Sequence, residues 1–279
     1  MSLLGKSVPR QAALRHVAGR GRFVDDITLP RMVHVAFVRS PMAAGVIRGI
    51  DTGAAAALPG VVRVFTGADL LGVCASFAGN SAAVPQLRSP PEHCLAVVRV
   101  CWQGEPVVAV VATSRAVAED AADLVQLDID STDPAVDPLA ALADNAVLVH
   151  PALGSNLAME ARIVSGDAAA GFAAADRVVT HDFNFGRHTG MPLEPRGLIA
   201  DYDPAADTLT VWQSHQAPHQ QQDVFATLLG IPEHRVQVIC PDVGGAFGVK
   251  LHAYPDELAV AAISKVLGRP VKFVADRLE

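Results

Sequence analysis

Short stretches in which apolar and polar positions alternate occur along the whole chain, and this period of two predicts β-strands. In the first half the predicted strands are 32–39, 61–66, 96–102, 106–113 and 124–129. In the second half they are 177–185, 198–202, 209–212, 236–240 and 271–274. The stretch 106–113 is apolar throughout, which is typical of a strand buried on both faces. Residues 203–207 separate two of the strands and predict a hairpin turn.

Apolar positions spaced by three and four residues predict helices between these strands. Four are expected at 51–58, 139–144, 217–230 and 255–267, and Gly268 closes the last of these. A further helix is expected to start at a cap, Thr113 or Ser114, and to run to Val125, and another is expected to end at Asp176. Glycine is the residue that most often ends a helix. A turn-rich run at 131–138 suggests a domain boundary nearby. The sequence therefore predicts an α+β fold with two domains, 1–145 and 146–279.

The hydrophobic content is high, at 51%, with a mean hydropathy of +0.30. The longest apolar stretches, 106–112 and 258–263, are nevertheless too short to span a bilayer. The first residues lack the sustained apolar core of a secretory signal. No membrane span is expected, and the protein is interpreted as soluble and cytoplasmic.

The cysteines and the charges exclude several classes of site. Cys74, Cys94, Cys101 and Cys240 form no C-x-x-C pair, which argues against a zinc ribbon, an iron–sulfur ligand set or a redox dithiol. A few such thiols suit a reducing cytoplasm. The net charge is −7, and no basic block is present. Nucleic acid is therefore not an expected partner.

The nine residues from Asp242 to Lys250 (DVGGAFGVK) lie between a predicted strand and a predicted helix. Glycines allow a ligand to approach the backbone, whose N–H groups can face an anion or a polar group. The spacing matches neither a P-loop nor the dinucleotide-binding G-x-G-x-x-G motif. On glycine content alone, a ligand-binding loop and a plain turn remain open alternatives.

Longer segments carry a more specific signal. MPLEPRGLIADYD, VWQSHQAPHQQQ, LLGIPEHRVQVICPDVGGAFGVK and LGRPVKFVADRLE together resemble the molybdopterin-binding large subunit of the xanthine dehydrogenase and aldehyde oxidase family. GRGRFVDDITLPRMVHVAFVRSPMA and QGEPVVAVVATSRAVAEDAADLVQLDID resemble its hammerhead domain. The resemblance implies an N-terminal α/β-hammerhead domain, followed by the first part of a mixed α+β molybdopterin-binding domain.

The resemblance also implies roles for individual residues. Gln216 matches the glutamine whose amide donates a hydrogen bond to an oxygen ligand of molybdenum. Phe247 matches a residue whose main chain lies beside the metal, with Gly245 and Gly248 in the same cofactor-binding loop. No side chain of this sequence is expected to ligate the metal directly. The general-base glutamate of the family lies beyond the matched part, so no catalytic residue is expected in this chain.

Several other residues have competing interpretations. His215 and His219 are four apart and could bind zinc on one helical face, although no third ligand is evident. Glu194 suits a capping or loop role as well as a catalytic one. Lys250 is expected to support the geometry of the loop rather than to be an exposed side chain. Cys240 is expected to be a core residue rather than a nucleophile.

The sequence departs from the family pattern in two ways. Purine-oxidising members have a substrate-binding glutamate directly after the lysine of the loop, whereas this chain has Leu251. Leu251 is therefore a candidate on the substrate side, for an aldehyde, an aromatic heterocycle or another small molecule of low polarity. The family's large subunit is also several hundred residues longer, so we expect either a split subunit or a truncated chain.

The leading hypothesis is a subunit or fragment of a molybdenum hydroxylase, an oxidoreductase that is inactive without the rest. The resemblance implies molybdenum-molybdopterin as cofactor, with iron–sulfur and FAD centres on partner subunits. A further partner would carry the remainder of the molybdopterin-binding domain. The reaction would hydroxylate a small molecule with oxygen from water. The alternative is a non-catalytic cofactor-handling or assembly module with a remnant site.

Overall fold

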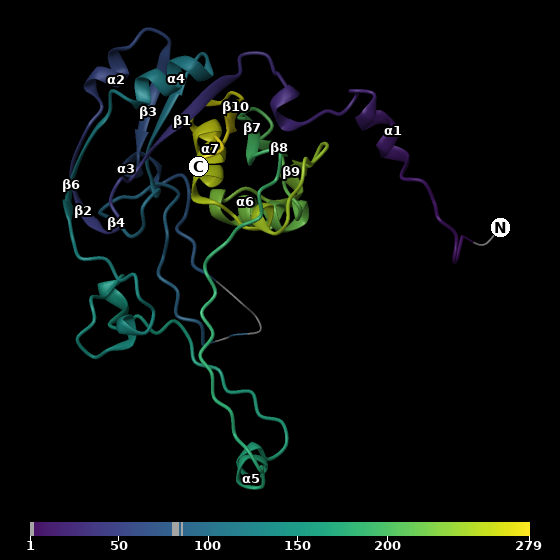
Figure 1. Ribbon diagram of the computed structural model, residues 1–279. Coiled ribbons are helices and arrows are strands. Elements are labelled where there is room, and N and C mark those ends of the chain that lie inside the picture. The colour runs from purple at the N-terminus through teal and green to yellow at the C-terminus, as the bar shows by residue number, and fades with distance from the viewer. Residues whose placement is uncertain (1–2, 80–83, 85) are drawn as a thin grey trace.

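The computed structural model describes residues 3–79, 84 and 86–279, so residues 1–2, 80–83 and 85 of the first predicted domain lie outside it (Figure 1). Its centre is a seven-stranded mixed sheet. In spatial order the strands are β3 (Val61–Thr66), β5 (Pro106–Ala112), β1 (Val33–Arg39), β10 (Val271–Val274), β7 (Gly197–Asp203), β8 (Thr208–Gln213) and β9 (Val236–Ile239). The pairs β1/β10 and β8/β9 are parallel and the others antiparallel. The first and last parts of the chain therefore share one sheet.

A smaller sheet and three short helices surround the edge of the large sheet that is built from the first half of the chain. The smaller sheet consists of β4 (Arg99–Val100), β2 (Gly45–Asp51) and β6 (Gln126–Ser131); the helices are α2 (Gly53–Ala57), α3 (Gly67–Leu70) and α4 (Arg115–Ala122). Val108 and Val110 of β5 pack towards this side, whereas Ala109 and Val111 pack into the main core. Strand β5 is thus buried on both faces, which explains its unbroken apolar sequence.

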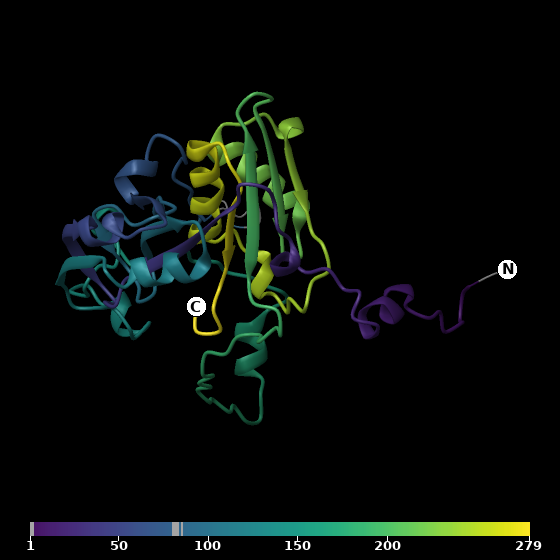
Figure 2. The ribbon, with the colours of Figure 1, turned by 90° about the horizontal axis from the view of Figure 1, so that it is seen from above.

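Two helices cover one face of the second half of the large sheet (Figure 2). They are α6 (Pro218–Leu229) and α7 (Pro255–Leu267), and their buried apolar residues belong to the main core cluster. Both end at a glycine in the left-handed region, Gly230 with φ 63° and Gly268 with φ 59°. The other face of β7 is covered at Ile199 by Val24 and Ile27 of the N-terminal segment.

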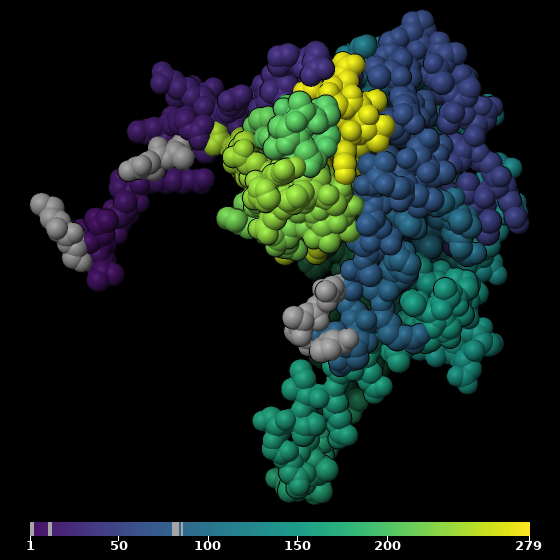
Figure 3. Space-filling model, turned by 180° about the vertical axis from the view of Figure 1, so that it is seen from behind, coloured from purple at the N-terminus to yellow at the C-terminus, as the bar shows by residue number. Residues whose placement is uncertain are grey.

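The remaining elements belong to neither sheet and are not among the helices described above. They are α1 (Gln11–Val17), α5 (Ala168–Ala173) and the 3-10 turns η1 (Val24–Asp26), η2 (Ala140–Leu142), η3 (Pro151–Leu153), η4 (Glu233–Arg235) and η5 (Val249–Leu251). Residues 157–189 form an extended arm with α5 at its tip, and the arm projects away from the body (Figures 1 and 3). Every described residue of this arm is exposed.

Most of the predicted elements are confirmed. Strands 61–66 and 271–274 and helix 255–267 have the predicted bounds, and the hairpin is formed by β7 and β8. Of the two proposed caps of α4, Ser114 is the one used, because its side chain accepts a hydrogen bond from the Val117 N–H. These elements were predictable because their pattern and their end signals agree.

Three predictions differ from the structure, and one strand was missed. Residues 177–185 form no strand, since no backbone partner lies beside them among the described residues. The strand at 96–102 is paired only over Arg99–Val100, and the helix at 139–144 is only the 3-10 turn η2. Strand β2 was not predicted, because Gly45 and Gly49 break its apolar pattern. For the three strands, a neighbouring segment, and not the local pattern, decides the pairing.

Within the residues that the structure describes, no helix has both the length and the apolar character needed to cross a bilayer.

Candidate functional site

Two segments from different parts of the sequence meet at one edge of the large sheet. Strands β8 and β9 are parallel neighbours, so their carboxyl ends lie at the same edge. Gln216 follows β8 and precedes α6, and the glycine loop 242–248 follows β9 and precedes α7. The sheet topology therefore brings together the two features that the sequence singled out.

Two hydrogen bonds join these segments directly. The Gly248 N–H donates to Oε1 of Gln216 at 3.1 Å, and the Gln216 N–H donates to the Lys250 carbonyl at 3.0 Å. Since Oε1 accepts from the loop, the NH₂ group of the same amide remains available to donate elsewhere. Gln216 is exposed, so this donor lies at the surface.

The backbone of the loop is strongly bent. Gly245, Phe247 and Gly248 have φ of 101°, 53° and 91°, and a positive φ is rare for a phenylalanine. A Cβ atom on Gly244 would lie 2.5 Å from Cβ of Glu194, so only glycine allows this approach. The Phe247 side chain is 75% exposed. The loop therefore holds strained backbone and an unburied aromatic ring at one place, which is typical of a binding site.

Three successive N–H groups of the loop have no acceptor in the part of the chain that the structure describes. Among the described residues, none accepts a hydrogen bond from the backbone N–H of Gly245, Ala246 or Phe247, whereas the flanking Gly244 and Gly248 N–H groups are both paired. A run of free N–H groups in a bent segment is suited to an anion or to polarised oxygen atoms. The loop and the Gln216 amide thus form one surface made of neutral donors.

Beneath this surface a buried ion pair fixes the loop. Lys250 has a fully buried side chain, and its Nζ donates to Oε2 of Glu194 at 3.0 Å and to Oγ of Ser214 at 2.7 Å. The same Glu194 oxygen accepts from the Gly244 N–H at 2.6 Å. Burial lowers the pKa of Lys250, and the Glu194 carboxylate opposes that shift. Lys250 therefore supports the loop geometry, as the sequence predicted. Glu194 also holds the loop, which is the loop role among its two interpretations.

A second buried network lies at the start of α7, and the sequence reasoning missed it. Arg196 donates to Asp256 at 2.8 and 2.9 Å and to Glu257 at 3.0 Å. Its guanidinium lies 3.9 Å from the ring centre of Tyr254, whose hydroxyl donates to the Val249 carbonyl at 2.6 Å. The network thus reaches the end of the glycine loop. Two acidic residues directly after Pro255 in the sequence were the available signal.

The two carboxyls of this network differ in acidity. Burial raises the pKa of Glu257 to about 7, although Arg196 opposes the shift. Hydrogen bonds and charge from Arg196, together with Arg39, hold the pKa of Asp256 below its usual range despite burial. Because Arg39 lies on β1 and Asp256 on α7, this network also links the two halves of the chain.

The N-terminal segment holds the first residue of the loop. The Arg22 N–H donates to Oδ2 of Asp242 at 2.7 Å, and the Asp242 N–H donates back to the Arg22 carbonyl at 3.0 Å. Arg15 donates to both carboxylate oxygens of Asp242 and holds the pKa of this carboxyl well below its usual range, with the Arg22 N–H and His16 contributing. The loop is therefore tied at both of its ends.

The other sequence candidates have structural roles. Buried His215 accepts a hydrogen bond from the Ala217 N–H at Nδ1, at 3.0 Å, and its Nε2 lies 3.3 Å from the His252 carbonyl. Both ring nitrogens are thus engaged, while His219 is exposed. Among the described residues, no group of three or more His, Cys, Asp or Glu could hold a metal ion. Burial raises the pKa of Cys240, which does not suit a nucleophile.

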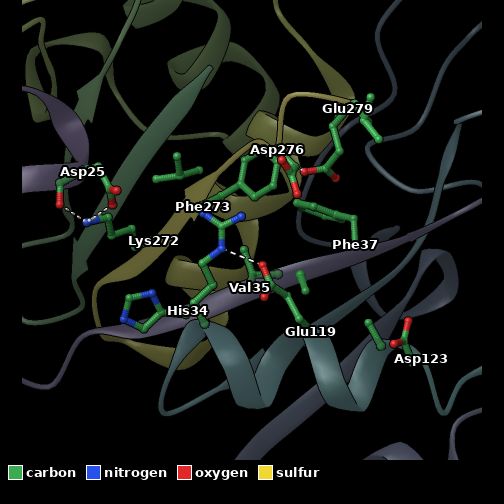
Figure 4. A pocket seen from close by; sticks show the side chains of 15 residues that line it. Asp25, His34, Val35, Phe37, Glu119, Asp123, Lys272, Phe273, Asp276 and Glu279 are labelled. Atoms are coloured by element: carbon green, nitrogen blue, oxygen red, sulfur yellow. Dashed lines mark hydrogen bonds and ion pairs between the residues drawn. The ribbon is translucent and has the colours of Figure 1, made fainter. Parts of the chain in front are cut away.

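A separate hollow of about 430 Å³ lies between β1, α4 and β10 (Figure 4). Its cations already have partners: Lys272 Nζ lies 2.9 Å from Oδ1 of Asp25, and Arg115 Nε donates to Glu119 at 2.6 Å. None of the candidate residues from the sequence lines it. The hollow therefore does not compete with the Gln216 edge as the candidate site.

Two known domain families match successive parts of the chain. Residues 18–133 match the family described as aldehyde oxidase and xanthine dehydrogenase, a/b hammerhead domain. Residues 149–279 match the family described as molybdopterin cofactor-binding domain, and this range contains Gln216 and the glycine loop. The two matches follow each other in the predicted order.

Individual proteins are similar over the whole chain. The nicotine 6-hydroxylase large subunit of Paenarthrobacter nicotinovorans is 40% identical over 279 residues, and the carbon monoxide dehydrogenase large chain of Afipia carboxidovorans is 37% identical over 289. These alignments cover 100% and 99% of this chain, but only 34% and 35% of the two relatives. The chain thus spans about a third of the length of the relatives it matches.

A solved structure gives the same result. The quinoline 2-oxidoreductase of Pseudomonas putida 86 aligns with a TM-score of 0.93 and 36% identity. The alignment covers 99% of this chain and 35% of the other. It therefore includes nearly all of the projecting arm as well as the body.

Proposed function

The chain belongs to the family of molybdenum hydroxylases that includes aldehyde oxidase and xanthine dehydrogenase, and on this premise we propose that it forms one wall of the molybdenum cofactor pocket. In this proposal the Gln216 amide and the backbone of Gly245, Phe247 and Gly248 contact the cofactor. The remainder of the molybdopterin-binding domain supplies the other walls and the general base. Iron–sulfur and FAD partner subunits carry the electrons away.

The observation that supports this proposal most strongly is that neutral hydrogen-bond donors of the loop and of Gln216 lie together. The free N–H groups of Gly245, Ala246 and Phe247 lie in the same loop that holds the Gln216 amide oriented. Neutral donors polarise oxygen atoms on a metal centre without adding a competing ligand charge. The carboxylates nearby are unsuitable as ligands, because Glu194 is already bound to Lys250 and Ser214.

When bound, the cofactor would supply two-electron oxidation of a substrate carbon, with oxygen from water. The residues of this chain would hold and orient it. Gln216 donates from a side chain whose rotation is restricted by the Gly248 N–H. The buried Lys250–Glu194 pair keeps the loop bent, so its donors need no rearrangement when the cofactor binds.

We propose an aromatic heterocycle or an aldehyde as the substrate class. Leu251 is 38% exposed and follows Lys250 directly, so it presents an apolar surface at the position where purine-oxidising members carry a glutamate. Nicotine and quinoline, after which two similar proteins are named, are both nitrogen heterocycles. A reducing compartment such as the cytoplasm is part of the proposal, because the four cysteines are free thiols.

The test is a complete large subunit with this chain as its first third, assembled with its iron–sulfur and FAD subunits. In this assembly Gln216→Ala should retain molybdenum and lower dye-linked turnover by roughly 10²–10³-fold, the usual effect of removing one oriented donor. Gln220→Ala, at an exposed glutamine of α6, is the matched control and should behave as wild type. A stable complex that contains no molybdenum would instead support the non-catalytic module.

A further inference from the structure

The projecting arm carries a segment with the sequence pattern of a strand, and this segment pairs with no other segment that the structure describes. In residues 177–185, Val179, Phe183 and Phe185 are 82%, 77% and 84% exposed. Among the described residues, none forms a backbone hydrogen bond with this segment. Exposed backbone groups and exposed large apolar side chains in one segment are a template for another chain.

Three large apolar side chains of this segment, Val179, Phe183 and Phe185, fall on one side, whereas Val178, 54% exposed, falls on the other. The rings of His181 and Phe183 lie 4.8 Å apart, and those of Phe183 and Phe185 lie 6.5 Å apart and nearly parallel, at 19°. The intervening residues Thr180, Asp182 and Asn184 are polar. Alternate residues of an extended chain point to opposite sides, so the segment has one apolar side and one largely polar side. It matches a strand of a sheet with one face in a core.

The end of the arm reaches the candidate site. A Cβ atom on Gly190 would lie 2.7 Å from Cβ of Phe247, so the chain that leaves the arm packs directly against the glycine loop. A polypeptide that binds along 177–185 and continues towards the base of the arm would therefore reach the glycine loop. The end of the arm and the glycine loop are in contact at Gly190.

The length of the relatives identifies the occupant. About two thirds of the nicotine 6-hydroxylase large subunit and of the quinoline 2-oxidoreductase chain lie outside their alignments with this chain. The arm is nevertheless within the aligned part, since 99% of this chain is covered at a TM-score of 0.93. The arm of this chain thus has the same conformation as in the quinoline 2-oxidoreductase, a longer chain in which additional polypeptide is available to cover it.

We propose that residues 177–185 are the docking strand for the polypeptide corresponding to those remaining two thirds. This polypeptide adds a β-strand along the segment and covers the row of Val179, Phe183 and Phe185. The inference rests on the proposed function, because it assumes that the chain is completed by such a polypeptide. It adds where the completing part binds: along the arm, and from there onto the glycine loop.

The test compares this chain alone with a chimaera, in which the chain is fused to the non-aligned two thirds of the nicotine 6-hydroxylase large subunit. Hydrogen exchange of the amides of 177–185 is the readout. We expect exchange near the unprotected rate in the chain alone and at least about 100-fold slower exchange in the chimaera, as for a paired strand.

The double variant Phe183→Asp/Phe185→Asp should abolish this protection in the chimaera. It should leave the melting temperature of the chain alone unchanged, because both rings are exposed there. The matched double variant Thr180→Asp/Asn184→Asp changes the polar side and should keep the protection. Equal protection in the two double variants would overturn the proposal.

Further outcomes also decide it. A chimaera that is unprotected at 177–185, or that stays unfolded beyond the fusion point, contradicts the proposal, because this arm must accept that polypeptide. Protection in the chain alone together with a dimer mass in sedimentation assigns the segment to a second copy instead. Protection of 177–185 without molybdenum uptake supports the docking strand and contradicts the proposed function. Molybdenum uptake with an unprotected arm supports the proposed function and contradicts the docking strand.

Discussion

At the scale of single residues, Lys250 illustrates how a buried charge can serve a loop. Its side chain is completely buried, and Glu194 and Ser214 satisfy it. Lysine is almost never fully buried without a partner, so a position like this one requires a matching acid. The sequence suggested a loop-supporting role for Lys250, but the identity of its partner, 56 residues away, came only from the fold.

Lys250→Met should destabilise the protein by about 3–5 kcal/mol, because it leaves the Glu194 carboxylate partly buried and unpaired. The measurement is urea-induced unfolding at pH 7. Adding Glu194→Gln to Lys250→Met should recover part of the loss, since the remaining amide carries no charge. A double variant that is less stable than Lys250→Met would contradict this account.

His215 should make stability depend on pH. Burial lowers the pKa of its imidazole below the ordinary 6.5, while the unfolded chain keeps the ordinary value. The unfolded state therefore binds more protons just below pH 6.5, so the contribution is complete above this pH and is lost as the pH falls towards the lowered pKa. Protonation would also remove the Nδ1 acceptor of the Ala217 N–H.

The matched variant is His215→Asn, whose side-chain oxygen can accept the same N–H but does not titrate. We expect similar stability of the two proteins at pH 8, within about 1 kcal/mol. Denaturation midpoints measured between pH 8 and about pH 5 should fall more for the wild type than for the variant. Parallel curves would show that His215 does not cause the acid sensitivity.

At the scale of elements, the glycine loop depends on close approach as well as on backbone freedom. Gly244→Ala should destabilise the loop by about 1–3 kcal/mol, because the new Cβ would meet Glu194 Cβ at 2.5 Å. Gly72→Ala is the control, since a Cβ there meets nothing within 4 Å. Thermal unfolding should separate the two variants, and equal melting temperatures would contradict the close packing.

The segment 177–185 shows where element prediction from sequence stops. Its alternating pattern correctly indicates extended chain with one apolar side, yet a strand exists only when a second segment supplies hydrogen bonds. The described part of this chain supplies none there. By contrast, helix α7 needs no partner for its own backbone bonds, and its bounds were predicted from its apolar spacing with Gly268 as the end signal.

At the scale of the whole molecule, the two predicted domains are joined through the centre of one sheet. Strand β1 pairs with β10, and Arg39 on β1 donates to Asp256 of α7 at 2.9 Å. The matched families confirm the predicted order of a hammerhead domain followed by a molybdopterin-binding domain. The boundary near residue 145 stays a prediction, because shared pairing does not fix where one domain ends.

Because of this shared sheet, the two halves should unfold together. The chain has two tryptophans, Trp102 in the first half and Trp212 in the second. Trp102→Phe and Trp212→Phe each leave one fluorescent reporter, and the two urea transitions should have the same midpoint. If the two midpoints differ by more than the substitutions themselves shift them, the halves unfold separately.

The sequence by itself determined the strands and helices with strong end signals, the order of the two domains and the glycine loop as a place to look. These features are local, since period, caps and turns act within a few residues. Tertiary structure decided the partners: Glu194 for Lys250, Arg196 for Asp256 and Glu257, and Gln216 for Gly248. For Gln216 and the loop the reason is the parallel pairing of β8 and β9, which sets which strand ends meet, and no local pattern specifies that neighbour.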